Sequence, residues 1–438
     1  MREGRTAPLT AVVALACACG AAAQTAQAPP ATALPEAPTG AAFEGVTFDE
    51  AVRRAVEHHP TVGQAAQAIL RAQALLDQAK SVFRPTLYGN VGATILDDAR
   101  GFNGFVTQPR TQAAFNATLA YPVLATARWA AKSQAADQVA IARISAEETR
   151  RQVALTAAQA YLAVIAAERQ REIALRNLDT ARALEEYAKA RLEAGKGSRL
   201  NHVRSTQERA AAEVQLEVAE LFVRQAQEAL GVATFSDAPL DARGDPELKP
   251  AAPPSSDAWL MQRPDVRLFS AQLQAADRVV RDAWTAWFPT GTAFFTPQYV
   301  NPKGGFEPAR TWRAVFQLQI PIFDGTLGPG KRVKVADLEA ARYRLDAVKV
   351  EARAELRLAQ DAVARTEQIV GTSRESSANA TEALRITELA YRAGATSNIE
   401  VVQAQQTARS AEIALAVAED RLRQARLDLL LALGQFPQ

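Results

Sequence analysis

Cysteine is nearly absent from this chain of 438 residues. Its only two cysteines, Cys17 and Cys19, lie in an N-terminal segment with the pattern of a cleavable secretory signal. A chain cleaved after Ala23 therefore has no thiol that could form a disulfide, bind a metal or act as a nucleophile. Cysteine chemistry is excluded for the mature chain.

Histidine is also scarce, and none of His58, His59 and His202 stands in a metal-ligand spacing such as His-Glu-x-x-His. His58 and His59 precede Pro60, where a helix is expected to break, and are interpreted as surface residues. No Gly-x-Gly-x-x-Gly motif follows a strand pattern, and Gly325–Gly330 lacks the Lys-Ser/Thr ending of a phosphate loop. We therefore expect no enzyme, no cofactor and no metal site.

Neither an excess of charge nor an abundance of aromatic residues marks the sequence. There are 50 Lys and Arg residues against 48 Asp and Glu residues, a net charge of +2, which gives no electrostatic case for nucleic acid. Aromatic residues make up 6% of the chain. Ala, Gln, Arg and Leu dominate instead, and this composition favours long helices over a globular enzyme.

The N-terminus predicts export from the cytoplasm. Two arginines precede a short apolar run and then small residues, so residues 1–23 are predicted to be a signal peptide, too short for a membrane span. Leu15-Ala16-Cys17 loosely matches a lipidation signal, which makes Cys17 a candidate lipidation site and leaves acylation of Cys17 or Cys19 open. A Pro-rich leader, residues 24–46, follows.

The remaining sequence is a tandem duplication. "RLEAGKGSRLNHV" at 191–203 aligns without a gap with "AYRAGATSNIEVV" at 390–402, "HHPTV" with "QRPDV", and "LAYPVL" with "LQIPIF". We predict a first structural repeat at 47–235, a linker at 236–257 that is rich in Pro and small polar residues, and a second repeat at 258–438.

Each repeat contains two segments of about ten residues in which apolar and polar side chains alternate, as in strands with one apolar face. The predicted strands are 86–96, 113–121, 291–300 and 311–320. At about 3.3 Å per residue and about 40° of tilt, such strands span the roughly 25 Å apolar band of an outer-membrane barrel. Hairpins of a soluble β-sandwich are the alternative.

Four strands are too few to close a barrel. Because an open sheet edge is intolerable in lipid, the membrane interpretation requires an oligomer. A trimer would supply twelve strands, an even number within the known range.

Two very long helical hairpins, 123–231 and 331–434, complete the repeats. Residues 123–194 contain no Gly or Pro, and about 70 residues at 1.5 Å each give a length on the order of 100 Å. Two adjacent apolar seams predict a helix that packs on two neighbours, although a plain antiparallel coiled-coil rod is an alternative. Gly195 and Gly394 permit left-handed turns, and the serines after them are placed to cap the next helices.

In their order, spacing and duplication, these motifs resemble the TolC-like outer-membrane efflux protein family, in its drug-efflux branch. "QRPDVR" at 262–267, "FPT" before the third strand, "QIPIFDG" at 319–325 and the paired "AG" turns carry the resemblance, which covers essentially the whole mature chain. It implies a mainly α fold with a transmembrane β part: a trimeric 12-stranded β-barrel in the outer membrane, continuous with a periplasmic α-helical barrel.

The resemblance also implies roles for the hairpin turns. It places Gly195, Ser198, Gly394 and Ser397 at periplasmic tips that dock onto periplasmic adaptor proteins of an inner-membrane transporter.

Past the second tip, the family commonly has two inward carboxylates that ring the closed pore. Glu400 and Gln403 occupy these positions here, so one acidic ring is implied and a second is not. Links between hairpins hold the family's closed state, and the matching positions are Tyr391, Asn201, where the family often has Asp, and Thr396, where some members have Arg. Solvated helix-tip side chains are the alternative for all five residues.

The resemblance implies a homotrimer in outer-membrane lipid that acts as a passive conduit for small molecules delivered by a pump and its adaptor. A channel for type I protein secretion shares this architecture and stays an alternative. In a different class, a soluble periplasmic coiled-coil scaffold or an adaptor would explain the helices, but an adaptor has one hairpin flanked by small β-domains.

Overall fold

The computed structural model describes residues 43–250, 257–305 and 308–436. The predicted signal peptide, with Cys17 and Cys19, and most of the leader lie outside these residues.

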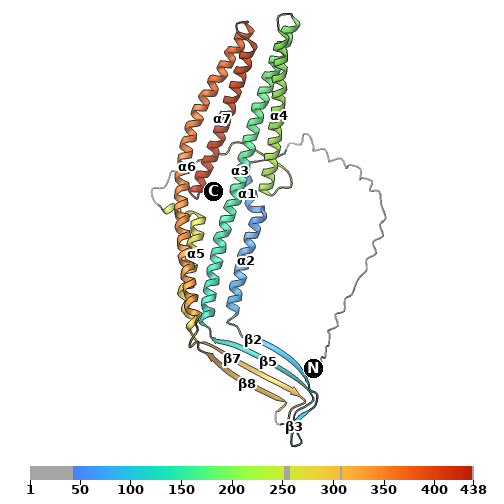
Figure 1. Ribbon diagram of the computed structural model, residues 1–438, viewed down its shortest axis with the longest axis vertical. Coiled ribbons are helices and arrows are strands. Elements are labelled where there is room, and N and C mark those ends of the chain that lie inside the picture. The colour runs from blue at the N-terminus through green and yellow to red at the C-terminus, as the bar shows by residue number, and fades with distance from the viewer. Residues whose placement is uncertain (1–42, 251–256, 306–307, 437–438) are drawn as a thin grey trace, which may run out of the picture. The chain divides into compact units, whose positions relative to one another are not determined.

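The described chain is mainly helical and carries a β part, as the sequence predicts (Figure 1). The elements of the first repeat are β1 Glu44–Val46, α1 Phe48–His58, α2 Pro60–Ser81, β2 Thr86–Ile95, β3 Arg100–Phe102, β4 Phe105–Gln108, β5 Thr111–Leu124, α3 Thr126–Glu193, α4 Arg199–Thr234 and β6 Leu240–Ala242. Those of the second are the 3-10 helix η1 Asp257–Gln262, α5 Pro264–Arg281, the 3-10 helix η2 Asp282–Trp287, β7 Thr290–Asn301, β8 Arg310–Gln319, α6 Leu327–Arg392 and α7 Asn398–Ala432.

The break between α1 and α2 shows how local sequence sets these boundaries. Pro60 stands in the first turn of α2, where its missing N–H leaves no bond unmade. His59 ends α1 and caps α2, because its Nδ1 accepts a hydrogen bond from the backbone N–H of Thr61 at 3.3 Å. His58 is exposed and His59 is half-buried, at the helix break that Pro60 predicts.

The four long strands form one antiparallel sheet in the order β2-β5-β7-β8. Its register places apolar side chains on one face and polar side chains on the other. On the apolar face, Leu87 lies opposite Leu119, which lies opposite Phe295. Asn90 and Asn116 pair on the other face, where their side chains form a hydrogen bond of 3.0 Å. Within the described residues, β2 and β8 have a strand partner on one side only.

The apolar face of the sheet is uncovered in the single chain. Val91 is 80% exposed, Trp312 71% and Leu87 69%. An apolar surface of this extent marks contact with lipid or with another protein, because soluble monomers rarely expose one.

The helices pack as two hairpins, α3 on α4 and α6 on α7. Most residues of the first apolar seam predicted along α3 are buried, among them Val153, Ala157, Val164, Leu178 and Ala188, whereas Ala160 and Leu192 of that seam are half-buried. Ala158 and Leu162 of the second seam are buried too. As these two seams require, α3 also contacts α1, α2, α5 and α7. Among the helices that the described residues form, none is both long and apolar enough to cross a membrane.

Arg263, in the Gln-Arg-Pro-Asp motif, ties the second repeat together. Its side chain is 6% exposed and forms two hydrogen bonds with the Asp265 carboxylate, at 3.0 and 2.7 Å. The same guanidinium reaches Glu355 on α6 at 2.8 Å and the carbonyl oxygen of Ala432, the last residue of α7, at 3.3 Å. One buried cation thus anchors α5 to both long helices of its repeat.

Candidate functional site

The turns of the two helical hairpins have the same backbone structure. Gly195 and Gly394 have φ of +70° and +79°, in the left-handed region that favours glycine. At the first turn, the N–H of Lys196 donates to the carbonyl of Arg191 at 2.9 Å; at the second, the N–H of Ala395 donates to the carbonyl of Ala390 at 2.8 Å. This backward bond ends each long helix in a Schellman motif.

The serines after the two glycines differ. Ser198 caps α4, because its side chain accepts a hydrogen bond from the N–H of Leu200 at 3.2 Å. Ser397 makes no such bond, so the prediction that its side chain caps α7 is wrong. Its hydroxyl donates to the carboxylate of Glu400 at 3.1 Å.

Glu400 lies exposed in the first turn of α7. The hydroxyl of Thr396 donates to its carboxylate, and this bond, with the one from Ser397, holds the pKa of Glu400 below its ordinary value. Glu400 is therefore charged at neutral pH. Gln403 lies exposed on the same helix, three residues further. Within the described chain, Thr396 is thus bonded inside its own tip.

Tyr391 joins the two hairpins. It is 6% exposed and meets Tyr187 of α3 edge to face, with ring centroids 5.6 Å apart and planes at 70°. The guanidinium of Arg191 lies 5.7 Å from the Tyr391 ring centre and 5.8 Å from that of Tyr187. Leu184 and Val401 pack beside them. We call Tyr187, Arg191 and Tyr391 the tip cluster; burial raises the pKa of Tyr391, so its ring stays neutral.

Asn201 contributes its backbone. Its carbonyl oxygen accepts a hydrogen bond from the side-chain amide of Asn398, at 3.3 Å, and Asn398 is 2% exposed. The five residues predicted at the pore mouth are therefore not one network: Tyr391 belongs to the tip cluster, Asn201 is joined to Asn398, and Thr396 is joined to Glu400. Tyr187 and Arg191 were missed by sequence reasoning, although both lie within two turns of the glycine.

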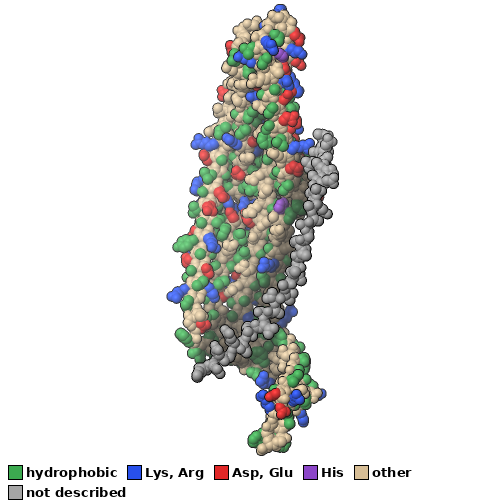
Figure 2. Space-filling model, turned by 45° about the vertical axis from the view of Figure 1, so that its right-hand side comes forward, with side chains coloured by type: hydrophobic (Ala, Val, Ile, Leu, Met, Phe, Trp, Pro, Cys, Tyr) green, Lys and Arg blue, Asp and Glu red, His purple; other side chains and the backbone are tan. Residues whose placement is uncertain are grey.

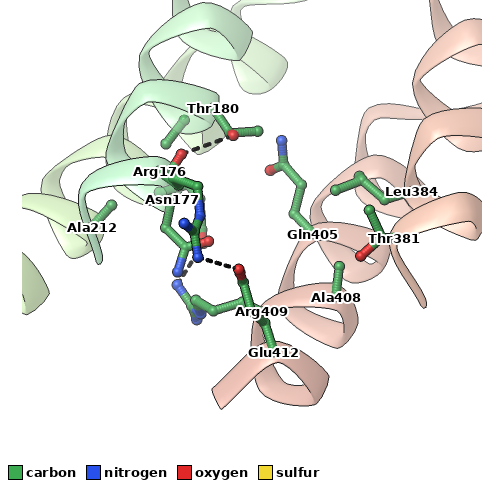
Figure 3. Close-up of a pocket in the computed structure, with 12 residues that line it drawn as sticks. Arg176, Asn177, Thr180, Ala212, Thr381, Leu384, Gln405, Ala408, Arg409 and Glu412 are labelled. Carbon is green, nitrogen blue, oxygen red and sulfur yellow. Dashed lines mark hydrogen bonds and ion pairs between the residues drawn. The ribbon is translucent and has the colours of Figure 1, made fainter. Parts of the chain in front are cut away.

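Farther from the tips, ion pairs cross from the first hairpin to the second. Arg169 pairs with Glu419 and Arg176 with Glu412, so a step of seven residues along α3 matches a step of seven back along α7. A cavity of about 230 Å³, lined by both polar and apolar side chains, adjoins the pair of Arg176 and Glu412. Gln405 projects from α7 toward the space between the hairpins (Figure 3).

Side chains of both charge signs are interspersed along the helices (Figure 2). In the part of the chain that the structure describes, no group of three or more His, Cys, Asp or Glu residues is placed to hold a metal ion.

Comparisons with known proteins agree with this architecture. The family model described as outer membrane efflux protein matches residues 51–234 and 256–435. Nodulation protein T of Rhizobium leguminosarum bv. viciae is 27% identical over 177 residues, 40% of this chain and 37% of that protein. The chain thus spans little more than a third of the length of that curated relative.

Solved channels share the fold. The Campylobacter jejuni CmeC outer membrane channel has a TM-score of 0.77 and 17% identity, with 89% of this chain and 87% of that one covered. The open state of the Neisseria gonorrhoeae MtrE outer membrane channel has a TM-score of 0.75 and 21% identity, with 88% of each chain covered. Since the family model matches both repeats, this chain belongs to the outer membrane efflux protein family, and the predicted location in the outer membrane is confirmed.

Proposed function

We propose that three copies of this chain form the outer-membrane channel of a tripartite efflux system, a passive conduit across the periplasm for small molecules. The observation that carries the proposal is the antiparallel sheet with one exposed apolar face, joined directly to two long helical hairpins. A sheet of this kind needs lipid on its apolar face, and the hairpins need a compartment beyond the membrane.

The sheet supports a trimer. Both of its outer strands, β2 and β8, lack a second partner within the described chain. In lipid, unpaired N–H and C=O groups cost several kcal/mol each, on the order of a whole hydrogen bond, so the edges must be closed by other copies. Three copies would give a barrel of twelve strands, with the polar face toward the lumen.

The hairpin turns support docking to a periplasmic adaptor protein. The Gly195 and Gly394 turns repeat one backbone motif, so a trimer would present six similar tips in a ring. Gly195, Ser198, Gly394 and Ser397 would form the surface that contacts the adaptor, which links the channel to an inner-membrane transporter.

Glu400 is the residue that we assign to the pore mouth, as a ring of three carboxylates with Gln403 beside it. Such a ring favours cations. The tip cluster and the bond from Asn398 to Asn201 would hold the closed state, and Thr396 would keep the Glu400 carboxylate in place.

Particle mass and export test the proposal together. The chain is extracted from isolated outer membranes in mild detergent and weighed by light scattering, and cells with and without it are assayed for export of small toxic compounds and of secreted proteins. A trimer whose loss sensitises cells to small compounds supports efflux. A trimer whose loss blocks only protein export indicates type I secretion, and a monomer or dimer outside the membrane excludes the channel.

A further inference from the structure

The end of the sheet that lies away from the helices carries four cations whose side chains bond to no other described residue. β2, β5, β7 and β8 join the helices at one end and are connected to one another by loops at the other. The cationic residues at the loop end are Arg100, Arg110, Lys303 and Arg310. All four are exposed, and none of their side chains bonds to another residue of the described chain.

This contrasts with the helices, where arginines are widely paired. None of the ion pairs between described residues involves residues 84–130 or 282–330, which include the whole sheet. Asp97 and Asp98 lie in the same loops, but their carboxylates accept backbone N–H bonds at 3.0 and 2.8 Å. Glu307 also stands in the sequence of the β7–β8 loop, so these loops contain acidic as well as basic residues.

An aromatic groove lies beside these cations. Its volume is about 600 Å³, and its walls include the rings of Phe115, Phe295, Tyr299 and Trp312. Phe295 and Trp312 face each other at 6.0 Å between ring centroids. Phe115, Tyr299 and Trp312 are 48%, 44% and 71% exposed, so the groove is open to whatever covers this face of the sheet.

Arg310 lies at the rim of the groove, on the same face. In the strand register, Val91 lies opposite Phe115, Phe115 opposite Tyr299, and Tyr299 opposite Arg310. This row belongs to the apolar face, which makes Arg310 a cation among exposed apolar side chains. A cation there is expensive at the middle of a bilayer and much less so near its surface, which fits a position at the end of the strands.

We propose that this groove binds a phosphorylated lipid of the outer leaflet, with its acyl chain on the four aromatic rings and its phosphate on Arg310. A guanidinium offers a planar pair of donors that matches a phosphate, and its apolar stem can lie along the groove. Arg100, Arg110 and Lys303 surround the site with further positive charge. The inference rests on the proposed function in two respects: the apolar face contacts lipid, and the loop end of the sheet lies at the outer surface of the membrane.

The test uses the full chain, extracted from outer membranes in mild detergent, and native mass spectrometry with two probes: bis-phosphorylated lipid A and the same lipid with both phosphates removed. The wild-type chain should bind the phosphorylated form on the order of tenfold more tightly, and added salt should weaken that preference. Equal binding of the two lipids by the wild-type chain would overturn the proposal without any variant.

Arg310→Gln should remove the preference for phosphate. Trp312→Ala should weaken binding of both probes, because it removes one of the aromatic rings on which the acyl chain lies. Arg313→Gln is the matched control: Arg313 lies on β8 opposite Thr296, on the polar face, and its loss should leave lipid binding unchanged. If Arg310→Gln does not give a particle of wild-type mass, Arg310→Lys replaces it and should keep a reduced preference for the phosphorylated lipid. The site would be contradicted if Arg310→Lys, or the control Arg313→Gln, abolished that preference.

Particle mass separates the two proposals. A particle that is not a trimer but prefers the phosphorylated lipid leaves the lipid site standing and contradicts the channel. A trimer that binds both lipids equally leaves the channel standing and contradicts the lipid site.

Discussion

Tyr187 and Tyr391, one from each hairpin, meet edge to face with ring centroids 5.6 Å apart, and the guanidinium of Arg191 lies over both rings. The contact joins α3 to α6 at the point where the hairpins turn. It is the only aromatic contact between the two hairpins among the described residues, so the relative position of the tips depends on it more than on any other pair of rings.

We predict that Arg191→Met loosens the tips. The substitution keeps the apolar stem but removes a cation that contributes roughly 0.5–1 kcal/mol to each exposed cation–π contact. Single-channel recording in planar bilayers should show longer or more frequent openings than for the wild-type chain. Arg199→Met is the control, since Arg199 is exposed in the first turn of α4 and has no side-chain partner in the described chain; its openings should be unchanged. Equal behaviour of the two variants would remove Arg191 from the closed state.

We predict that Gly394→Ala destabilises the second tip through the backbone alone. A Cβ at Gly394 would meet no atom within 4 Å, but its φ of +79° is strained for alanine by about 1–2 kcal/mol. Hydrogen exchange of the amides in the turn should therefore accelerate roughly 5- to 30-fold.

Gly371→Ala is the matched control. Gly371 lies within α6 with open space around it and no left-handed φ, so alanine should stabilise the helix by about 0.5–1 kcal/mol and slow local exchange. Faster exchange in Gly371→Ala, or unchanged exchange in Gly394→Ala, would contradict this account of the turn.

The sequence predicted the parts of the fold in which a short pattern repeats over many residues. Ten or more residues of alternating character define each long strand, and the 3/4 spacing along α3 predicted most of the positions that are buried. The β3–β4 hairpin was missed because its strands have three and four residues, too few to show alternation, although Asn103-Gly104 is a strong turn signal. The β1–β6 pair, which joins Glu44 to Leu240, is also too short for any pattern.

The site was less predictable, because its contacts join residues that are far apart in sequence. The turns at Gly195 and Gly394 follow from local chemistry and could be located. The stacking of Tyr187 on Tyr391 depends on how two hairpins pack, and no local pattern carries that information. Ser397 shows the opposite limit. It matches Ser198 in the repeat, yet its side chain accepts no bond from a backbone N–H of α7 and donates instead to Glu400, which stands where the first repeat has Asn201.

We predict that Arg263→Met strongly destabilises the second repeat. The loss of Arg263 leaves the carboxylates of Asp265 and Glu355, 22% and 57% exposed, without their buried cation and costs about 1–3 kcal/mol. The thermal unfolding midpoint of the extracted chain should fall by several degrees. Arg365→Met removes an arginine whose pair with Asp361 is 70% and 69% exposed, so the change should stay within about 1 kcal/mol. A similar midpoint for both variants would show that Arg263 is not an anchor.

The same cluster predicts a loss of stability in acid. Burial acts to raise the pKa of Asp265, but the hydrogen bonds and charge of Arg263 outweigh burial and hold that pKa below its ordinary value. A carboxyl whose pKa is lowered by folding stabilises the folded state above the pKa of the unfolded chain. That contribution is lost as the pH falls below about 4 and through the folded pKa. The fall of the unfolding midpoint between pH 5 and pH 2 should therefore be shallower in Asp265→Asn than in the wild-type chain.

We predict that Glu400→Gln reduces the preference of the channel for cations. The hydroxyls of Thr396 and Ser397 lower the pKa of Glu400, so three copies would place three negative charges at the pore mouth at neutral pH. Reversal potentials in a salt gradient should shift toward zero in the variant, and the wild-type preference should fade as the pH drops through the lowered pKa. Glu193→Gln is the matched control, because Glu193 is exposed at the end of α3 in the first tip and has no side-chain partner in the described chain. If both variants shift the reversal potential equally, the charge of the tips as a whole sets the preference; if neither does, Glu400 does not line the pore.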